Sequence, residues 1–198
     1  VQWVQIDEPV LTTSFPVEDL DIIQEVYEAL TQAAPSLNIM LQTYFGSLDH
    51  YERLTELPVQ GLGLDFVYDD GENLQHISRH GFPKGKTLGA GVIDGRNIWR
   101  SDLNAMAALL GQLAEQINAE QLIVQPSCSL LHVPVSLEAE HKLDRELVHA
   151  LAFADEKLDE IAVLTAALGK HDPSALAKLE QSAEAVARFN SSAARVQT

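Results

Sequence analysis

The stretch Thr87–Asn97, TLGAGVIDGRN, passes from a short apolar segment directly into a group of polar residues. Its first part, Thr87–Ile93, is typical of a buried β-strand. The same order occurs four more times, with apolar segments at residues 1–6, 37–41, 59–64 and 122–125. A helix-like segment follows each of them. Parallel strands with polar residues at their C-terminal ends are typical of the active face of a β/α-barrel.

Size and charge limit the class of protein. The chain has 198 residues, of which 46% are hydrophobic, and this is enough for one domain with a sizeable core. It has 13 basic and 29 acidic residues, which give a formal net charge of −16. Because such a surface repels polyanions, we expect neither nucleic acid nor an anionic membrane as a partner.

The single cysteine, Cys128, excludes a disulfide within the chain, which suits a reducing compartment. No apolar run approaches the roughly 20 residues that span a bilayer. No signal peptide is visible at the N-terminus. We therefore expect a cytoplasmic protein. Since a complete eight-unit barrel needs about 250 residues, we also expect a segment of a larger protein.

The remaining pattern predicts the helices. Pro16 suits the first turn of a helix, and Ser101 is a plausible N-cap for another. Short helices are expected at 48–57 and 73–80, and a long helical stretch at 137–169. Asp172 and Pro173 are expected to begin the last helix as N-cap and first residue.

The predicted architecture is therefore α/β. It is a partial (β/α)8 barrel of the TIM type, with about five βα units, a long C-terminal helix and a helical tail. We expect residues 1–168 to form the barrel portion, and residues 169–198 the helical tail or the start of a linker.

Several side chains at the strand ends are candidates for ligand binding. They are Asp7, Glu8, Asp65, Asp94, Arg96, Asn97, Ser127, Cys128 and His132. Adjacent side chains of a strand point to opposite faces, so only one of Asp7 and Glu8 can face the barrel mouth. Arg96 is suited to bidentate carboxylate recognition, but an internal ion pair with Asp7 or Asp65 is the preferred interpretation. Asp65 could hold a metal or an amine, or form a structural ion pair.

Cys128 and His132 admit two interpretations. A cysteine and a histidine can form a nucleophilic pair or half of a zinc site. Zinc takes three or four protein ligands, however, and the chain has no second cysteine. We therefore expect a buried, inert Cys128, with no metal site and no catalytic residue in this chain. A degenerate metal site at Asp65, Cys128 and His132 is a weaker hypothesis.

Several longer motifs resemble those of a known protein family. They are WVQIDEP at 3–9, TYF at 43–45, LPVQGL at 57–62, GVIDGRNIWR at 91–100, SCSLLHVP at 127–134 and LAFA at 151–154. In this order they resemble the N-terminal half of cobalamin-independent methionine synthase. The resemblance covers nearly the whole chain.

The resemblance implies a function. That family transfers a methyl group from 5-methyltetrahydropteroyl-polyglutamate to homocysteine and so makes methionine. It has two related β/α-barrels, and the C-terminal barrel carries the catalytic zinc. This chain would be the latter part of the N-terminal barrel, a scaffold that is inactive alone and has no cofactor of its own. Its partners would be the rest of that barrel and the catalytic barrel.

The relation between the two barrels also implies a lost metal site. By strand order, the zinc ligands of the catalytic barrel correspond here to about Thr43, Phe45, Asp65 and Cys128. Thr43 and Phe45 cannot replace an imidazole and a thiolate, so the resemblance implies the remnant of a zinc site.

Two further hypotheses remain open. One is a standalone small-molecule binding module that uses the strand-end face. The other is a homodimer formed through open sheet edges, since parallel sheets are normally covered and closed.

Overall fold

The computed structural model describes residues 1–170 and 172–192. The chain divides into two compact units. The first comprises Val1–Val92 and Leu113–Cys128, and the second comprises Ile93–Gln112 and the residues from Ser129 onward. The boundary predicted at residue 168 stays a prediction.

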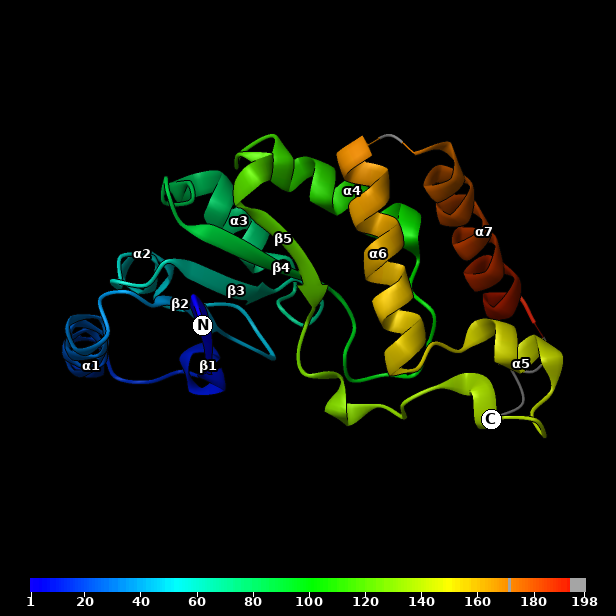
Figure 1. The fold of residues 1–198 in the computed structure, drawn as a ribbon, viewed down its shortest axis with the longest axis horizontal. Helices are drawn as coiled ribbons and strands as arrows, with labels where there is room; N and C mark the ends of the chain where they lie inside the picture. The colour runs from blue at the N-terminus through cyan, green and yellow to red at the C-terminus, as the bar shows by residue number, and fades with distance from the viewer. Residues whose placement is uncertain (171, 193–198) are drawn as a thin grey trace. The chain divides into compact units, whose positions relative to one another are not determined.

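A five-stranded sheet forms the centre of the first unit (Figure 1). Its strands are β1 (Trp3–Asp7), β2 (Asn38–Gln42), β3 (Gly61–Asp65), β4 (Thr87–Ile93) and β5 (Leu122–Pro126). Their order in the sheet is the order in the sequence, and β1 to β4 pair in parallel. Because every connection advances one strand in the same direction, there is no reversal point of the doubly wound kind. This is the topology of a TIM-type barrel, and the α/β prediction is confirmed.

Two glutamines show how strongly the sheet curves. Gln125 Nε2 on β5 donates a 2.8 Å hydrogen bond to Gln42 Oε1 on β2, across the two strands between them. Gly63 and Gly89 make this possible. A Cβ at Gly63 would lie 1.8 Å from Gln42 Oε1, and one at Gly89 would lie 2.5 Å from Gln125 Oε1. The side of the sheet that carries both amides is therefore the concave interior of the partial barrel.

The outer strands of the sheet are the exposed ones. β2, β3 and β4 are almost completely buried, as strands of a covered parallel sheet are. By contrast, Trp3 and Val4 on β1 are 43% and 36% exposed, and Ile123 on β5 is 45% exposed. Trp3 is thus less buried than an ordinary packing residue.

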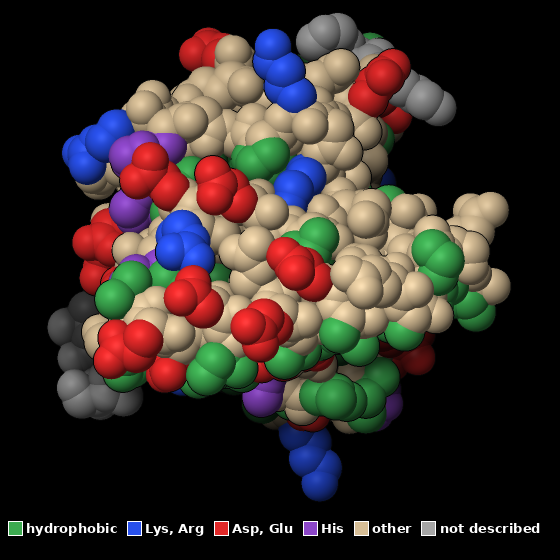
Figure 2. Space-filling model, turned by 90° about the vertical axis from the view of Figure 1, so that its left-hand side faces the viewer, with side chains coloured by type: hydrophobic (Ala, Val, Ile, Leu, Met, Phe, Trp, Pro, Cys, Tyr) green, Lys and Arg blue, Asp and Glu red, His purple; other side chains and the backbone are tan. Residues whose placement is uncertain are grey.

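The helices of the first unit are α1 (Asp19–Ala33), α2 (Tyr51–Thr55) and α3 (Glu72–His80), with 3-10 turns at Pro9–Thr12 and Ala119–Gln121. Helix α1 buries Leu20 and Tyr27. Its other face exposes Ile22, Val26 and Leu30, which are four residues apart and therefore lie in one row. Figure 2 shows the side of the molecule on which α1 and α2 lie, with many acidic side chains among the hydrophobic ones.

The second unit is mostly helical. Helix α4 (Leu103–Ala114) begins in it, and α5 (Arg145–Ala150), α6 (Ala154–Lys170) and α7 (Pro173–Asn190) follow, with 3-10 turns at Leu130–His132 and Leu137–Ala139. Asp172 Oδ1 accepts a hydrogen bond from Ser174 N, so the predicted start of the last helix is confirmed.

Three helix predictions were wrong. Helix α1 begins at Asp19, so Pro16 precedes the helix and does not lie in its first turn. The continuous helix over 137–169 is broken between α5 and α6, because Leu151 is extended and bridges Trp99, while Phe153 N donates to Glu156 Oε2. The predicted N-cap Ser101 is not the cap of α4. Asp102 Oδ1 accepts from the backbone N–H groups of Asn104 and Ala105 instead.

Across residues 1–170 and 172–192, no helix has both the length and the apolar character that crossing a membrane requires.

Candidate functional site

The ends of β1, β2 and β5 meet at Tyr44, the second residue after β2. Gln5 Nε2 donates to Tyr44 Oη at 3.3 Å and to Asp7 Oδ1 at 2.7 Å. Burial raises the pKa of the Tyr44 phenol, and the neighbouring Asp7, followed by Cys128, raises it further, whereas the hydrogen bond from Gln5 lowers it. Asp7 and Cys128 come from opposite edges of the sheet, and the curvature brings both to Tyr44.

This Tyr44 cluster (Gln5, Asp7, Tyr44 and Cys128) offers a carboxylate, an amide and a phenol to a polar ligand. Sequence reasoning proposed Asp7 and Cys128 but not Tyr44. The signal in the sequence was its position two residues after a strand, in the TYF motif. An uncharged side chain at such a position is a weaker indication of a binding site than a carboxylate or a thiol.

Glu8 has different neighbours from Asp7. Its backbone N–H donates to Gln42 O at 2.9 Å. Burial raises the pKa of Tyr27 on α1, and the charge of Glu8 raises it further. Asp7 acts on Tyr44 at the strand ends, whereas Glu8 acts on a helix residue. The two adjacent carboxylates therefore have separate surroundings, and which of them faces the barrel mouth stays a prediction.

Asp65 is completely buried at the end of β3 and connects two loops. Its Oδ2 accepts from Phe45 N at 2.9 Å. Its Oδ1 accepts from Val67 N at 2.8 Å and from Tyr68 N at 3.0 Å. Burial raises the pKa of Asp65, and these three backbone hydrogen bonds oppose that rise. Both oxygens thus have structural partners, which favours a role in holding the loops in place.

Asn73 extends this arrangement. Its Nδ2 donates to Asp65 O at 2.8 Å, and its Oδ1 accepts from Leu48 N at 3.3 Å. Its own backbone N–H donates to Asp69 Oδ2 at 2.9 Å. Asp65, Asp69 and Asn73 are all buried. They hold the loops after β2 and β3 together beneath the strand ends.

Asp94 and Asn97 form a turn at the end of β4. Asp94 Oδ1 accepts from Arg96 N at 2.8 Å and from Asn97 N at 3.3 Å. Asn97 Nδ2 donates to Asp94 Oδ2, and Asn97 Oδ1 accepts from Trp99 N at 2.9 Å. These are the side chain–backbone bonds typical of Asp and Asn in turns. The exposed Arg96 lies within this turn.

The residues after β5 differ in exposure. Ser127 and Cys128 are buried, whereas His132 is exposed in the 3-10 turn Leu130–His132. Ser129 Oγ caps that turn by accepting from Leu131 N at 3.3 Å. Cys128 belongs to the first unit and His132 to the second. The roles proposed for these residues in ligand binding stay predictions.

The buried thiol leads to a chemical prediction. Because Cys128 is 2% exposed, we expect its reaction with iodoacetamide to be at least about 100-fold slower than that of free cysteine. In denaturant, one thiol per chain should react at the ordinary rate. Mass spectrometry of the alkylated chain, with Cys128→Ser as the control, measures both rates. Rapid alkylation of the folded chain would contradict the burial.

The zinc-remnant positions do not suit a metal. Thr43 Oγ1 donates to Gly63 O at 2.8 Å, Phe45 offers no ligand atom, and the Asp65 oxygens accept from backbone N–H groups. Across residues 1–170 and 172–192 there is no group of three or more His, Cys, Asp or Glu that could hold a metal ion. The hypothesis of a degenerate metal site at Asp65, Cys128 and His132 therefore gains no support.

A family model described as "Cobalamin-independent synthase, N-terminal domain" matches residues 1–118. The chain belongs to this family. The residues that the family model matches include β1 to β4 and α1 to α4. The resemblance found in the sequence motifs is thereby confirmed.

Curated relatives of this synthase-family chain carry the name 5-methyltetrahydropteroyltriglutamate–homocysteine methyltransferase. The protein of Listeria innocua is 52% identical over 193 residues, which are 98% of this chain and 25% of the relative. The protein of Bacillus velezensis is 46% identical over 186 residues, 94% of this chain and 24% of the relative. The chain thus spans about a quarter of the length of these relatives.

Proposed function

We propose that this chain is the latter part of the N-terminal barrel of a cobalamin-independent methionine synthase. The complete protein would transfer the methyl group of 5-methyltetrahydropteroyl-polyglutamate to homocysteine. The observation that carries the proposal is the 52% identity to the Listeria innocua methyltransferase, which extends over 98% of this chain. In line with this function, we place the protein in the cytoplasm.

Within that protein, the chain acts as a scaffold. In support, the buried carboxylates at its strand ends bind backbone N–H groups. Asp65 holds the loops after β2 and β3, and Asp69 holds the start of α3. The zinc of the parent enzyme belongs to the other barrel in this proposal, since the corresponding residues here do not suit a metal. No step of methyl transfer is assigned to a residue of this chain.

The rest of the N-terminal barrel is the partner we propose for β1 and α1. Trp3 and Val4 are exposed on β1, and the row Ile22, Val26 and Leu30 is exposed on α1. A strand and a helix that are apolar on their outer sides suit coverage by a neighbouring βα unit. In the isolated chain, the same surfaces would favour a homodimer.

The test compares two preparations in one assay. We expect the complete natural protein to form methionine from homocysteine and the methylfolate donor, and residues 1–198 alone to form none above the blank. Light scattering of the isolated chain should give a dimer or a larger species. Methionine formation by the isolated chain would contradict the scaffold role, and an inactive complete protein would contradict the assigned reaction.

A further inference from the structure

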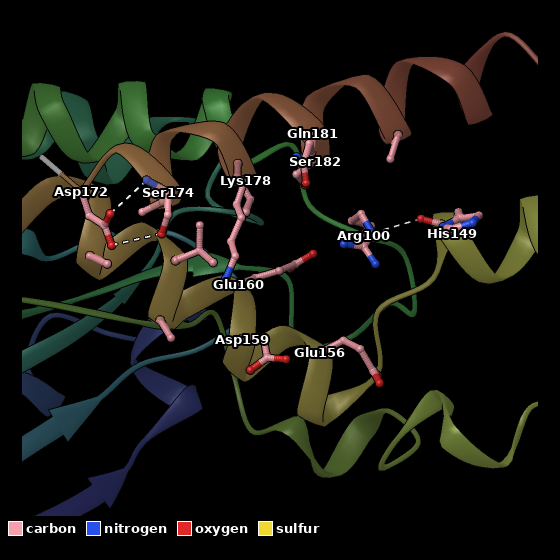
Figure 3. A pocket seen from close by; sticks show the side chains of 16 residues that line it. Arg100, His149, Glu156, Asp159, Glu160, Asp172, Ser174, Lys178, Gln181 and Ser182 are labelled. Carbon is pink, nitrogen blue, oxygen red and sulfur yellow. Dashed lines mark hydrogen bonds between the residues drawn. The ribbon is translucent and has the colours of Figure 1, made fainter.

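The second unit contains a cavity between α6 and α7, lined by both charged and apolar side chains, that the proposed function does not use. Its volume is about 570 Å³, and its lining residues come from α6, α7 and other segments of the second unit (Figure 3). Arg100, Glu160 and Lys178 line it together with apolar side chains such as Leu103 and Val163. This size is within the range of small-molecule sites, which are mostly apolar with a few polar groups that fix orientation.

Glu160 has a buried oxygen without a partner. The residue is 4% exposed, and its Oε1 accepts from Ser101 N at 3.0 Å. Its Oε2 is buried and has no hydrogen-bond partner among residues 1–170 and 172–192. Figure 3 shows the carboxyl end of Glu160 lying between Arg100 and the end of Lys178, which extends from α7 toward α6. A buried carboxylate oxygen without a donor is unfavourable, so a ligand N–H group here would be stabilised.

The other acidic residues of the cavity are either hydrogen-bonded or exposed. Glu156 accepts from Leu137 N through Oε1 at 3.1 Å and from Phe153 N through Oε2 at 3.0 Å. Asp172 accepts from Ser174 N and from the Ser174 hydroxyl. Asp159 is exposed. Glu160 is therefore the buried carboxylate that has an oxygen available for a ligand.

Arg100 supplies the opposite charge. Its Nε donates to His149 O at 3.0 Å, and its backbone N–H donates to Ala150 O at 2.9 Å, so the side chain is held in place. Within residues 1–170 and 172–192, its Nη atoms have no hydrogen bond or ion pair. Burial raises the pKa of the Glu160 carboxyl, and the hydrogen bonds from Ser101, followed by the charges of Lys157 and Arg100, oppose that rise. A guanidinium with two free nitrogens is suited to bind a carboxylate.

We propose that this cavity binds a zwitterionic α-amino acid with an aliphatic side chain. The ammonium group would donate to Glu160 Oε2, the carboxylate would bind the Arg100 guanidinium, and the side chain would pack against Leu103 and Val163. All the residues that line the cavity belong to the second unit, and the proposed function assigns none of them a role.

The test uses the complete natural protein that contains this chain, with L-norleucine as the probe. Norleucine has no sulfur and accepts no methyl group in the proposed reaction. We expect saturable binding by isothermal titration calorimetry. Glu160→Gln and Arg100→Gln should each weaken it at least about tenfold, because each removes a charge-assisted hydrogen bond. Glu180→Gln, an exposed position on α7 outside the cavity, is the matched control and should leave binding unchanged within about twofold.

Two half-ligands test the same idea on the unmodified protein. Pentylamine lacks the carboxylate of norleucine and hexanoate lacks the ammonium, so each should bind at least about tenfold more weakly. This arm decides the question if a variant fails to fold, as checked by circular dichroism. No saturable norleucine binding, unchanged binding in Glu160→Gln and Arg100→Gln, or a half-ligand that binds as tightly as norleucine would overturn the proposal. The methionine-forming assay is independent of all three results.

Discussion

Gly91→Ala is expected to lower the free energy of unfolding by about 3 kcal/mol or more. A Cβ at Gly91 in β4 would lie 2.8 Å from Leu64 O, 2.9 Å from Ser127 Cα and 3.2 Å from Pro126 O. These are backbone atoms on both sides of the strand, so no side-chain rotation can relieve the overlap. Equilibrium urea unfolding followed by circular dichroism measures the effect.

Gly111→Ala is the matched control for that substitution. Gly111 lies within α4, and a Cβ there would meet nothing within 4 Å. Alanine has the higher helix propensity, so this variant should be neutral or more stable by up to about 1 kcal/mol. Equal losses in both variants would mean that the close approach at Gly91 is not the cause.

Asp65→Ala is expected to lower the free energy of unfolding by about 4 kcal/mol, because it leaves the backbone N–H groups of Phe45, Val67 and Tyr68 without their acceptor. Asp65→Asn should cost less, about 2 kcal/mol, since it keeps one oxygen but turns an N–H₂ group toward one set of donors. Urea unfolding measures both variants.

The control for Asp65 is another aspartate with an ordinary environment. Asp49 is exposed and accepts a single hydrogen bond from Ser14 Oγ at 3.1 Å. Asp49→Ala should change the free energy of unfolding by no more than about 0.5 kcal/mol. If Asp65→Ala were as mild as Asp49→Ala, the loop-holding role of Asp65 would be wrong.

The free energy of unfolding should depend on pH through the ionisation of Asp65. Burial raises the pKa of Asp65 above its ordinary value, so the folded state binds more protons than the unfolded state between the two pKa values. The contribution of Asp65 to the free energy of unfolding therefore falls as pH rises from about 4 through the folded-state pKa. Asp65→Asn should remove this part of the slope. Urea unfolding over a pH series measures it.

The sequence predicted the sheet more accurately than it predicted the helical unit. The expected strand 87–93 and the structural strand Thr87–Ile93 have the same bounds, because the apolar run and its polar end are local features. The helix expected over 137–169 was broken instead. A bridge from Trp99 to Leu151 and a bond from Phe153 N to Glu156 interrupt it, and both depend on contacts that the helical spacing of the apolar residues does not reveal.

The sequence by itself determined the order of parallel strands and helices, the polar residues at the strand ends and the family. Only the tertiary structure decided what those residues contact. Asp65 was a candidate for a metal or an amine, and it binds backbone N–H groups of two loops. Tyr44 became part of a cluster because curvature brings β1 and β5 to it. Strand and helix patterns follow from neighbouring residues, whereas the partner of a buried polar group comes from segments far away in the chain.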